Sequence, residues 1–250
     1  MFKKFLFITL FSFFGFAYST SIVAKHIDLA DKLRVRTQKF SKEVFLIQLN
    51  INKEQNLKNL KITATNFTKT LNELEGKGNL KAIKTEAIEK ELQIIKQLWQ
   101  QFDSKIQNIL NNKATDKDYE FIKNNNFKFL KTIMRLVNLY TKFANEHYKF
   151  KYANNINYAG KNRTRCEKIV KDILAYKINK DKKNLQELQK TINLFEKTLN
   201  GLIDGSKEFK LNKTTLPTIR KQLLDAKNFW QQTKPLIFQS VKNSVMLSLF

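Results

Sequence analysis

Two segments of the sequence carry the same pair of arginines. IDLADKLRVRTQKFSKE at residues 27–43 and INYAGKNRTRCEKIVKD at residues 156–172 both contain the pattern Arg-x-Arg. The chain has 46 basic residues, almost all of them lysine, and these two segments hold four of its six arginines. A guanidinium presents two parallel donors that match a carboxylate or a planar oxyanion. The pattern therefore fits recognition of a small anion.

The two arginines of each pair are expected on different sides of a helix, because residues two apart point about 200° apart. Arg34 and Arg163 then share the packing face with small residues, whereas Arg165 points away toward the surface. An arginine on a packing face needs a matching charge, and small neighbours leave room for one. The alternative is that the arginines pair with carboxylates of other helices or pack their stems and reach solvent. The residues expected to form a ligand site are Arg163, Arg34, Gly160, Ala159 and Ala30.

The arginine segments belong to a longer internal repeat. Downstream of them, NLKNLKITATNFTKTLN at residues 56–72 and NLQELQKTINLFEKTLN at residues 184–200 are identical at nine of 17 positions. The motif WQQ then follows at Trp99 and again at Trp230. Three blocks that recur in the same order indicate a tandem duplication.

Each copy is predicted to be helical, because its apolar residues recur three or four positions apart. We expect the second helix of the later copy to end at Asp204 and Gly205, and its third helix to begin at Pro217. In the earlier copy the third helix is expected from about Thr85 to Leu110. A helical pattern in residues 116–159 predicts a fourth helix that runs almost directly into the second copy.

The predicted fold is all-α. It consists of two tandem antiparallel helical bundles joined by a long helix. The first is a four-helix bundle at residues 26–152, and the second, at residues 153–250, lacks a fourth helix. That second bundle is expected either to remain a three-helix bundle or to be completed by a partner.

The first 20 residues are predicted to be a secretory signal peptide, because Lys3 and Lys4 precede an apolar run that ends in small residues. An uncleaved N-terminal anchor is the alternative. We therefore expect a periplasmic or secreted protein, whose single cysteine excludes an intrachain disulfide.

The formal net charge of +24 would suit a nucleic-acid partner in the cytoplasm, but export argues against one. Peripheral contact with acidic lipids or envelope polymers remains open. Two histidines and the lack of a nucleophile or metal-ligand motif argue against an enzyme, a cofactor and a metal site.

The segments INYAGKNRTRCEKIVKD, KTINLFEKTLNGLIDG and WQQTKPLI together resemble the N-terminal domain of type IV pili methyl-accepting chemotaxis transducers, the PilJ-type family. That family is similar to the sensor domain of NarX-type nitrate-responsive kinases. The resemblance implies an extracytoplasmic antiparallel four-helix bundle in each copy. The usual opening of the family resembles INLAGRQRMLSQRMAK, which places its ligand-contacting arginine on Arg163 and Arg34.

In the nitrate sensors of this kind, that arginine meets its symmetry mate across a dimer interface around one anion. The second copy keeps Ala159 and Gly160 of the family pattern. The first copy has Asp31 where the family has glycine, and from one turn away this carboxylate is placed to neutralise Arg34.

The function expected from the resemblance is sensing or binding of a small anion such as nitrate or a carboxylate. The resemblance to the nitrate sensors implies a homodimer as one expected partner. A membrane receptor is the other, because no signalling segment follows the second copy. The alternative is a structural or interaction protein of the cell envelope. Its cationic helices would contact acidic polymers, lipids or a partner bundle.

Overall fold

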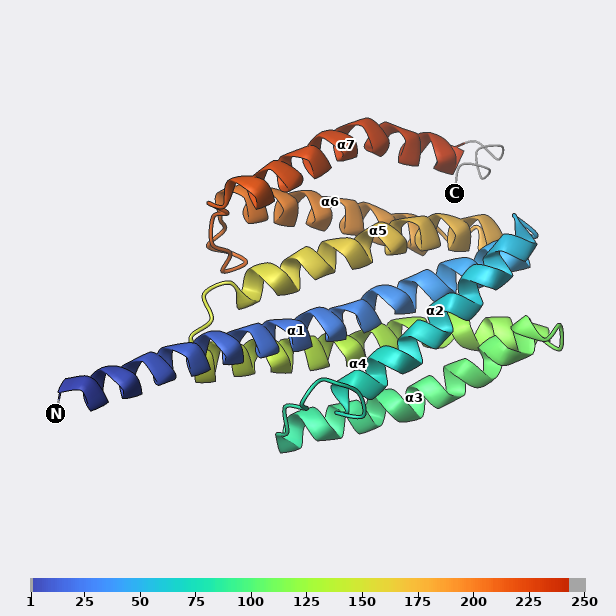
Figure 1. Ribbon diagram of the computed structural model, residues 1–250. Coiled ribbons are helices and arrows are strands. Elements are labelled where there is room, and N and C mark those ends of the chain that lie inside the picture. The colour runs from blue at the N-terminus through green and yellow to red at the C-terminus, as the bar shows by residue number, and fades with distance from the viewer. Residues whose placement is uncertain (1, 243–250) are drawn as a thin grey trace.

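The computed structural model describes residues 2–242, with the side chains of residues 20–241. This part of the chain forms seven helices, and its only β-type pairing is an isolated bridge between Ser206 and Leu211 (Figure 1). The all-α prediction is confirmed. The helices are α1 (Phe2–Gln48), α2 (Lys53–Leu74), α3 (Glu86–Leu110), α4 (Asp116–Tyr148), α5 (Ala153–Asn179), α6 (Lys182–Asp204) and α7 (Pro217–Lys242).

Helix ends lie where the capping and turn residues predict them. Thr85 precedes α3, and its side chain accepts a hydrogen bond from the backbone N–H of Ile88 at 3.3 Å. Asp204 is the last residue of α6, and Gly205 follows it with φ of +89°, a conformation that favours glycine. Pro217 is the first residue of α7, where its missing N–H costs no helical hydrogen bond.

The long helix between the two units ends before the second unit begins. Lys149 follows α4 in the left-handed conformation, with φ of +47°, so the helix cannot continue through it. Residues 149–152 then lead into α5. The division of the chain into residues 26–152 and 153–250 stays a prediction.

The first helices of the two copies, α1 and α5, pack against each other along the middle of the molecule (Figure 1). On the other sides of α1 lie α2 and α4, and α3 packs against α4 and α2. On the other side of α5 lies α6, which α7 covers. The two units therefore lie side by side and meet through equivalent helices.

The core of the first unit is closed by aromatic rings from four helices. Phe67 of α2 stacks on Trp99 of α3 with 4.1 Å between ring centroids. Phe102 of α3 stacks on Phe129 of α4 at 4.8 Å, and Phe40 of α1 contacts all four of these rings. All five side chains are buried.

The second unit repeats part of this packing with fewer helices. Phe195 of α6 and Trp230 of α7 correspond to the stacked pair of the first unit, and their ring centroids lie 4.4 Å apart. The Trp230 indole donates to Glu196 Oε1 at 2.9 Å. In the first unit Trp99 donates in the same way to Thr68, the counterpart of Glu196, at 3.0 Å. The duplication is therefore visible in side-chain contacts as well as in sequence.

The predicted signal peptide, residues 1–20, lies almost wholly outside the side chains that the structure describes. Among the helices of the described residues, none combines the length and the apolar character that a membrane span needs.

Candidate functional site

At the α1–α5 interface, Asp31 and Arg34 of α1 form a buried ion pair. Arg34 Nη2 donates to Asp31 Oδ1, one helical turn away. The side chains of Arg34 and Asp31 are 1% and 0% exposed. A charged pair this deeply buried is stable only when its members are matched and hydrogen-bonded, so further partners are expected around it.

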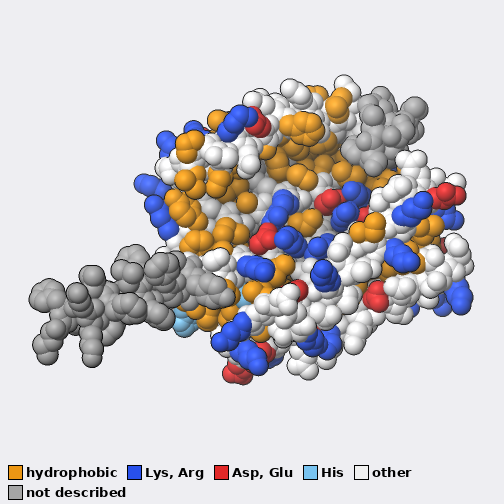
Figure 2. All heavy atoms as spheres, viewed as in Figure 1, with side chains coloured by type: hydrophobic (Ala, Val, Ile, Leu, Met, Phe, Trp, Pro, Cys, Tyr) orange, Lys and Arg blue, Asp and Glu red, His pale blue; other side chains and the backbone are white. Residues whose placement is uncertain are grey.

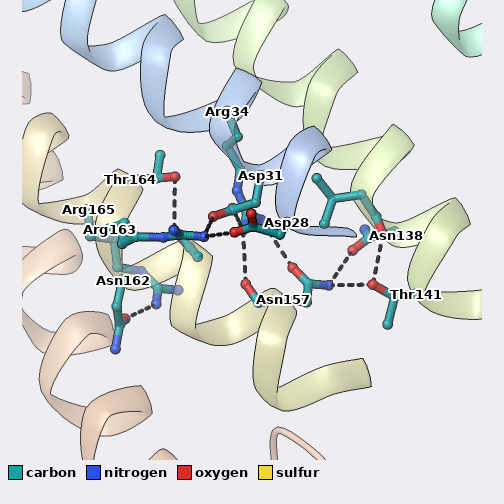
Figure 3. A network of polar contacts seen from close by, with 12 residues as sticks. Asp28, Asp31, Arg34, Asn138, Thr141, Asn157, Asn162, Arg163, Thr164 and Arg165 are labelled. Carbon is teal, nitrogen blue, oxygen red and sulfur yellow. Dashed lines mark hydrogen bonds and ion pairs between the residues drawn. The ribbon is translucent and has the colours of Figure 1, made fainter. Parts of the chain in front are cut away.

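Arg163 of α5 supplies one of those partners from the other copy. Its Nη2 lies 2.7 Å from Asp31 Oδ2 and 2.9 Å from Asp28 Oδ1. Figure 3 shows its side chain extending toward the two carboxylates of α1. The Arg163 side chain remains 48% exposed. One carboxylate, that of Asp31, therefore bridges the arginines of the two copies.

Gly160 makes room for this bridge. In the repeat it is the counterpart of Asp31, and it faces that residue across the interface. A Cβ atom at Gly160 would lie 1.9 Å from Asp31 Cγ, much closer than any real contact. The Asp31 carboxylate can therefore occupy its position only because its counterpart has no side chain.

Asn157 and Asp28 also occupy matching positions of the repeat, and each contacts the arginine of the opposite copy. Arg34 Nη2 donates to the backbone oxygen of Asn157 at 2.9 Å, and its Nη1 donates to Asn157 Oδ1 at 3.2 Å. Each arginine thus contacts the same position of the opposite copy. The Asn157 amide in turn donates to Asn138 Oδ1 at 3.2 Å and to Thr141 Oγ1 at 3.3 Å, both on α4.

Positive groups outnumber carboxylates at the centre of the interface. Two guanidinium groups face the carboxylates of Asp28 and Asp31, and Lys32 also pairs with Asp28 at 2.7 Å. Burial raises the pKa of the Asp31 carboxyl, and the two arginines beside it oppose that rise. Burial, with the neighbouring Arg34 and Arg165, lowers the pKa of Lys161 to about 8. A concentration of positive charge is therefore present, but its central carboxylate comes from the chain itself.

A comparison with protein-family models matches the N-terminal domain of type IV pili methyl-accepting chemotaxis transducers, PilJ, at residues 19–120 and 149–247. The chain belongs to this family. The two PilJ segments correspond to the two copies of the repeat, and most of α4 lies between them. No curated protein and no solved structure matches the chain.

In receptors, the PilJ domain is a sensor domain that lies in the periplasm. In this chain the two PilJ segments pair their first helices and bring the first arginine of each Arg-x-Arg pair, Arg34 and Arg163, to the same carboxylate. Ala30 is buried on α1, near this cluster. Ala159 is exposed on α5 and lines a separate groove beside α7.

Arg165 does not point to the surface, and the prediction that placed it there is wrong. Its Nη1 donates to Asn162 Oδ1 at 2.7 Å and to Thr198 Oγ1 of α6 at 2.8 Å. The reason is that α5 lies between α1 and α6, so residues on opposite sides of the helix both meet protein. Its counterpart Arg36 makes the same link in the first PilJ segment, to Thr70 Oγ1 of α2 at 2.7 Å.

Sequence reasoning missed Asp28 and Asn157, which hold the two arginines from the opposite copy. A signal for them was present, because both stand six residues before the arginine they correspond to in the repeat. Their polarity on an otherwise small and apolar face marked that position in both PilJ segments.

Proposed function

We propose that the chain is an exported, non-enzymatic PilJ-type module in which the Asp31 carboxylate takes the place of a small anion between the two family arginines. The observation that carries this proposal is the bridge from Asp31 to both Arg34 and Arg163. The carboxylate offers the planar pair of oxygens that a nitrate or a free carboxylate would offer.

A tethered carboxylate is a strong competitor for this position. Asp31 is fixed one turn from Arg34, so its effective concentration at the arginines far exceeds that of a free anion in solution. The chain also supplies both arginine helices, α1 and α5, so a homodimer is not needed to bring two such helices together. The module would therefore hold the anion-bound arrangement without any anion.

In this proposal the module acts through protein contacts outside the cytoplasm, as an accessory to a membrane receptor or another envelope partner. Export is supported by the apolar N-terminal segment and by the periplasmic place of the PilJ domain in receptors. The net charge of +24 also favours contact with acidic envelope surfaces.

Thermal melts in different salts of equal ionic strength test the proposal. The wild type should melt at the same temperature in formate, acetate, nitrate and chloride. Asp31→Gly should lose about 3–5 kcal/mol of stability, because two guanidinium groups are left without their shared carboxylate. Formate, acetate or nitrate should restore part of that loss in proportion to its concentration.

Two variants separate site-specific rescue from general salt effects. Asp31→Gly combined with Arg163→Gln should no longer respond to the anions. Asp28→Ala removes a carboxylate that is only partly buried, and it should gain little or no anion response.

Binding of a free anion by the wild type is a second candidate function. It is favoured by the 48% exposure of the Arg163 side chain, which solvent anions can reach. A concentration-dependent rise of the wild-type melting temperature that Arg163→Gln abolishes would overturn the internal-carboxylate proposal in favour of this one.

A further inference from the structure

Equivalent apolar residues of the two units differ in exposure. Ile88 on α3 is 1% exposed, whereas its counterpart Ile219 on α7 is 46% exposed. Ala30 on α1 is buried and its counterpart Ala159 on α5 is exposed. The same apolar surface is therefore covered in the first unit and uncovered in the second.

The cover in the first unit is α4. Arg135 of α4 donates from Nε to Glu91 Oε1 at 3.0 Å, which fixes α4 beside the end of α3 that carries Ile88. Tyr140 of α4 contacts His26 of α1 with 5.2 Å between ring centroids, one turn before Ala30. In the second unit, no described helix takes the corresponding place.

In the second unit, apolar residues of three helices line one continuous groove of about 300 Å³ between α5, α6 and α7. Ile156 and Ala159 come from α5, Leu202 comes from α6, and Ile219 and Leu223 come from α7. Hydrophobic side chains gather over these three helices in Figure 2. The groove has the apolar lining that receives one face of an amphipathic helix.

We propose that this groove binds an amphipathic helix of another protein, with acidic residues on either side of its apolar stripe. We expect the bound partner to be a helix, because a helix, α4, covers the equivalent surface of the first unit. The charge follows from Lys151 and Lys213, which directly precede the lining residues Tyr152 and Thr214 in the chain. Lys151 Nζ lies 5.5 Å from the centroid of the Tyr152 ring.

A second copy of the chain is a poorer occupant. Each copy carries a formal net charge of +24, so the charges of two copies oppose their association. An acidic helix instead gains from the same charge, both in its rate of association and in its orientation. This inference stands apart from the proposed function, because the groove does not include Asp31, Arg34 or Arg163.

A labelled peptide derived from α4 provides the probe. The peptide spans residues 127–148 and carries Lys131→Glu, Arg135→Glu and Lys142→Glu, three changes at exposed positions that leave its apolar stripe intact. Fluorescence anisotropy should show saturable binding of this acidic peptide to the full chain. The unmodified basic peptide should bind at least tenfold more weakly.

Ile219→Glu in the full chain should weaken binding of the acidic peptide at least tenfold, because it places a carboxylate in the groove. Ile62→Glu is the matched control, since Ile62 is 57% exposed on α2, away from the groove. It should leave the affinity unchanged. Circular dichroism melts of both variants establish that each is folded.

Four results would overturn the inference. The first is the absence of saturable binding, and the second is binding that Ile219→Glu does not weaken. The third is sedimentation of the wild type as a dimer that Ile219→Glu dissociates, which would assign the groove to a second copy. Equal affinity for the acidic and basic peptides would exclude the acidic partner.

Discussion

The two units share their local contacts and differ in what completes them. Each links the second arginine of its Arg-x-Arg pair to an equivalent threonine, and each packs a tryptophan against an equivalent phenylalanine. The first unit adds a covering helix, α4, and the buried carboxylate of Asp31. The second has an open groove and Gly160 at those places. The two copies therefore keep the same helix pairs. They differ in the central carboxylate, which Asp31 supplies and Gly160 does not, and in the covering helix α4, whose place in the second unit is an open groove.

Exchanging Asp31 and Gly160 tests the symmetry of the centre most severely. Gly160→Asp alone puts a second carboxylate into space that Asp31 already fills, so it should cost more than about 4 kcal/mol of unfolding free energy. Asp31→Gly together with Gly160→Asp should recover most of this loss. The carboxylate then lies one turn before Arg163 and faces Arg34. Urea denaturation measures the unfolding free energies of the wild type, of Gly160→Asp and of the double variant.

The double variant is the decisive measurement, because it restores the number of charges and the total side-chain volume at positions 31 and 160. If it is no more stable than Gly160→Asp, the two copies are not interchangeable about the interface. The central carboxylate would then be a property of α1 alone.

The sequence made the helices predictable, but not how the two units face each other. Apolar spacing and the residues Thr85, Gly205 and Pro217 marked helix ends, because periodicity and capping act within a few residues. The contact between Asp31 and Gly160 depends instead on packing between helices far apart in the sequence. Arg165 was misplaced for the same reason, since only the position of α6 gives that side of α5 a partner.

The exposure of Ala159 also depended on tertiary structure. Its counterpart Ala30 is buried, and the two sequences around them are similar. Whether a small residue on such a face meets an arginine cluster, a helix or solvent is set by the presence of α4. Spacing within α5 alone carries no information on that neighbour.

Glu43 should make the stability of the chain depend on pH. Its counterpart Asp172 pairs with Lys168 and Lys171, at 2.5 and 2.9 Å. Glu43 instead accepts a hydrogen bond from Thr63 at 3.1 Å. Burial raises the pKa of Glu43 from 4.5 to about 7, and the hydrogen bond from Thr63 opposes that rise only in part. The folded chain therefore keeps a proton on Glu43 that the unfolded chain releases. Between these two pKa values, stability should fall as the pH rises.

Glu43→Gln removes this titration and keeps an acceptor for Thr63. Relative to the wild type, its unfolding free energy should rise from pH 4.5 to pH 7 by up to about 3 kcal/mol. Urea denaturation across this range measures the difference, and Glu120→Gln, at an exposed position of α4, controls for the loss of one charge. A difference that does not change with pH would mean that Glu43 is ionised in the folded chain.

The smallest expected loss of stability comes from breaking the arginine–threonine link that both units contain. Thr70→Val and Thr198→Val each remove the hydroxyl that accepts from an arginine, at 2.7 Å from Arg36 and 2.8 Å from Arg165. Each should cost about 1–2 kcal/mol, the usual effect of losing a hydrogen bond to a partly buried charge. The Thr198 change should cost more, because Thr198 also donates to Asn162 Oδ1 at 2.6 Å.

Double-mutant cycles that pair these changes with Arg36→Met and Arg165→Met isolate the two arginine links from the rest of each side chain. Coupling energies that agree within about 0.5 kcal/mol would mean that the duplication conserved the strength of the link as well as its geometry. A coupling near zero in the second unit alone would assign the role of Thr198 to Asn162. Arg165 would then be held by Asn162 of its own helix, and the link to α6 would contribute nothing to joining the helices.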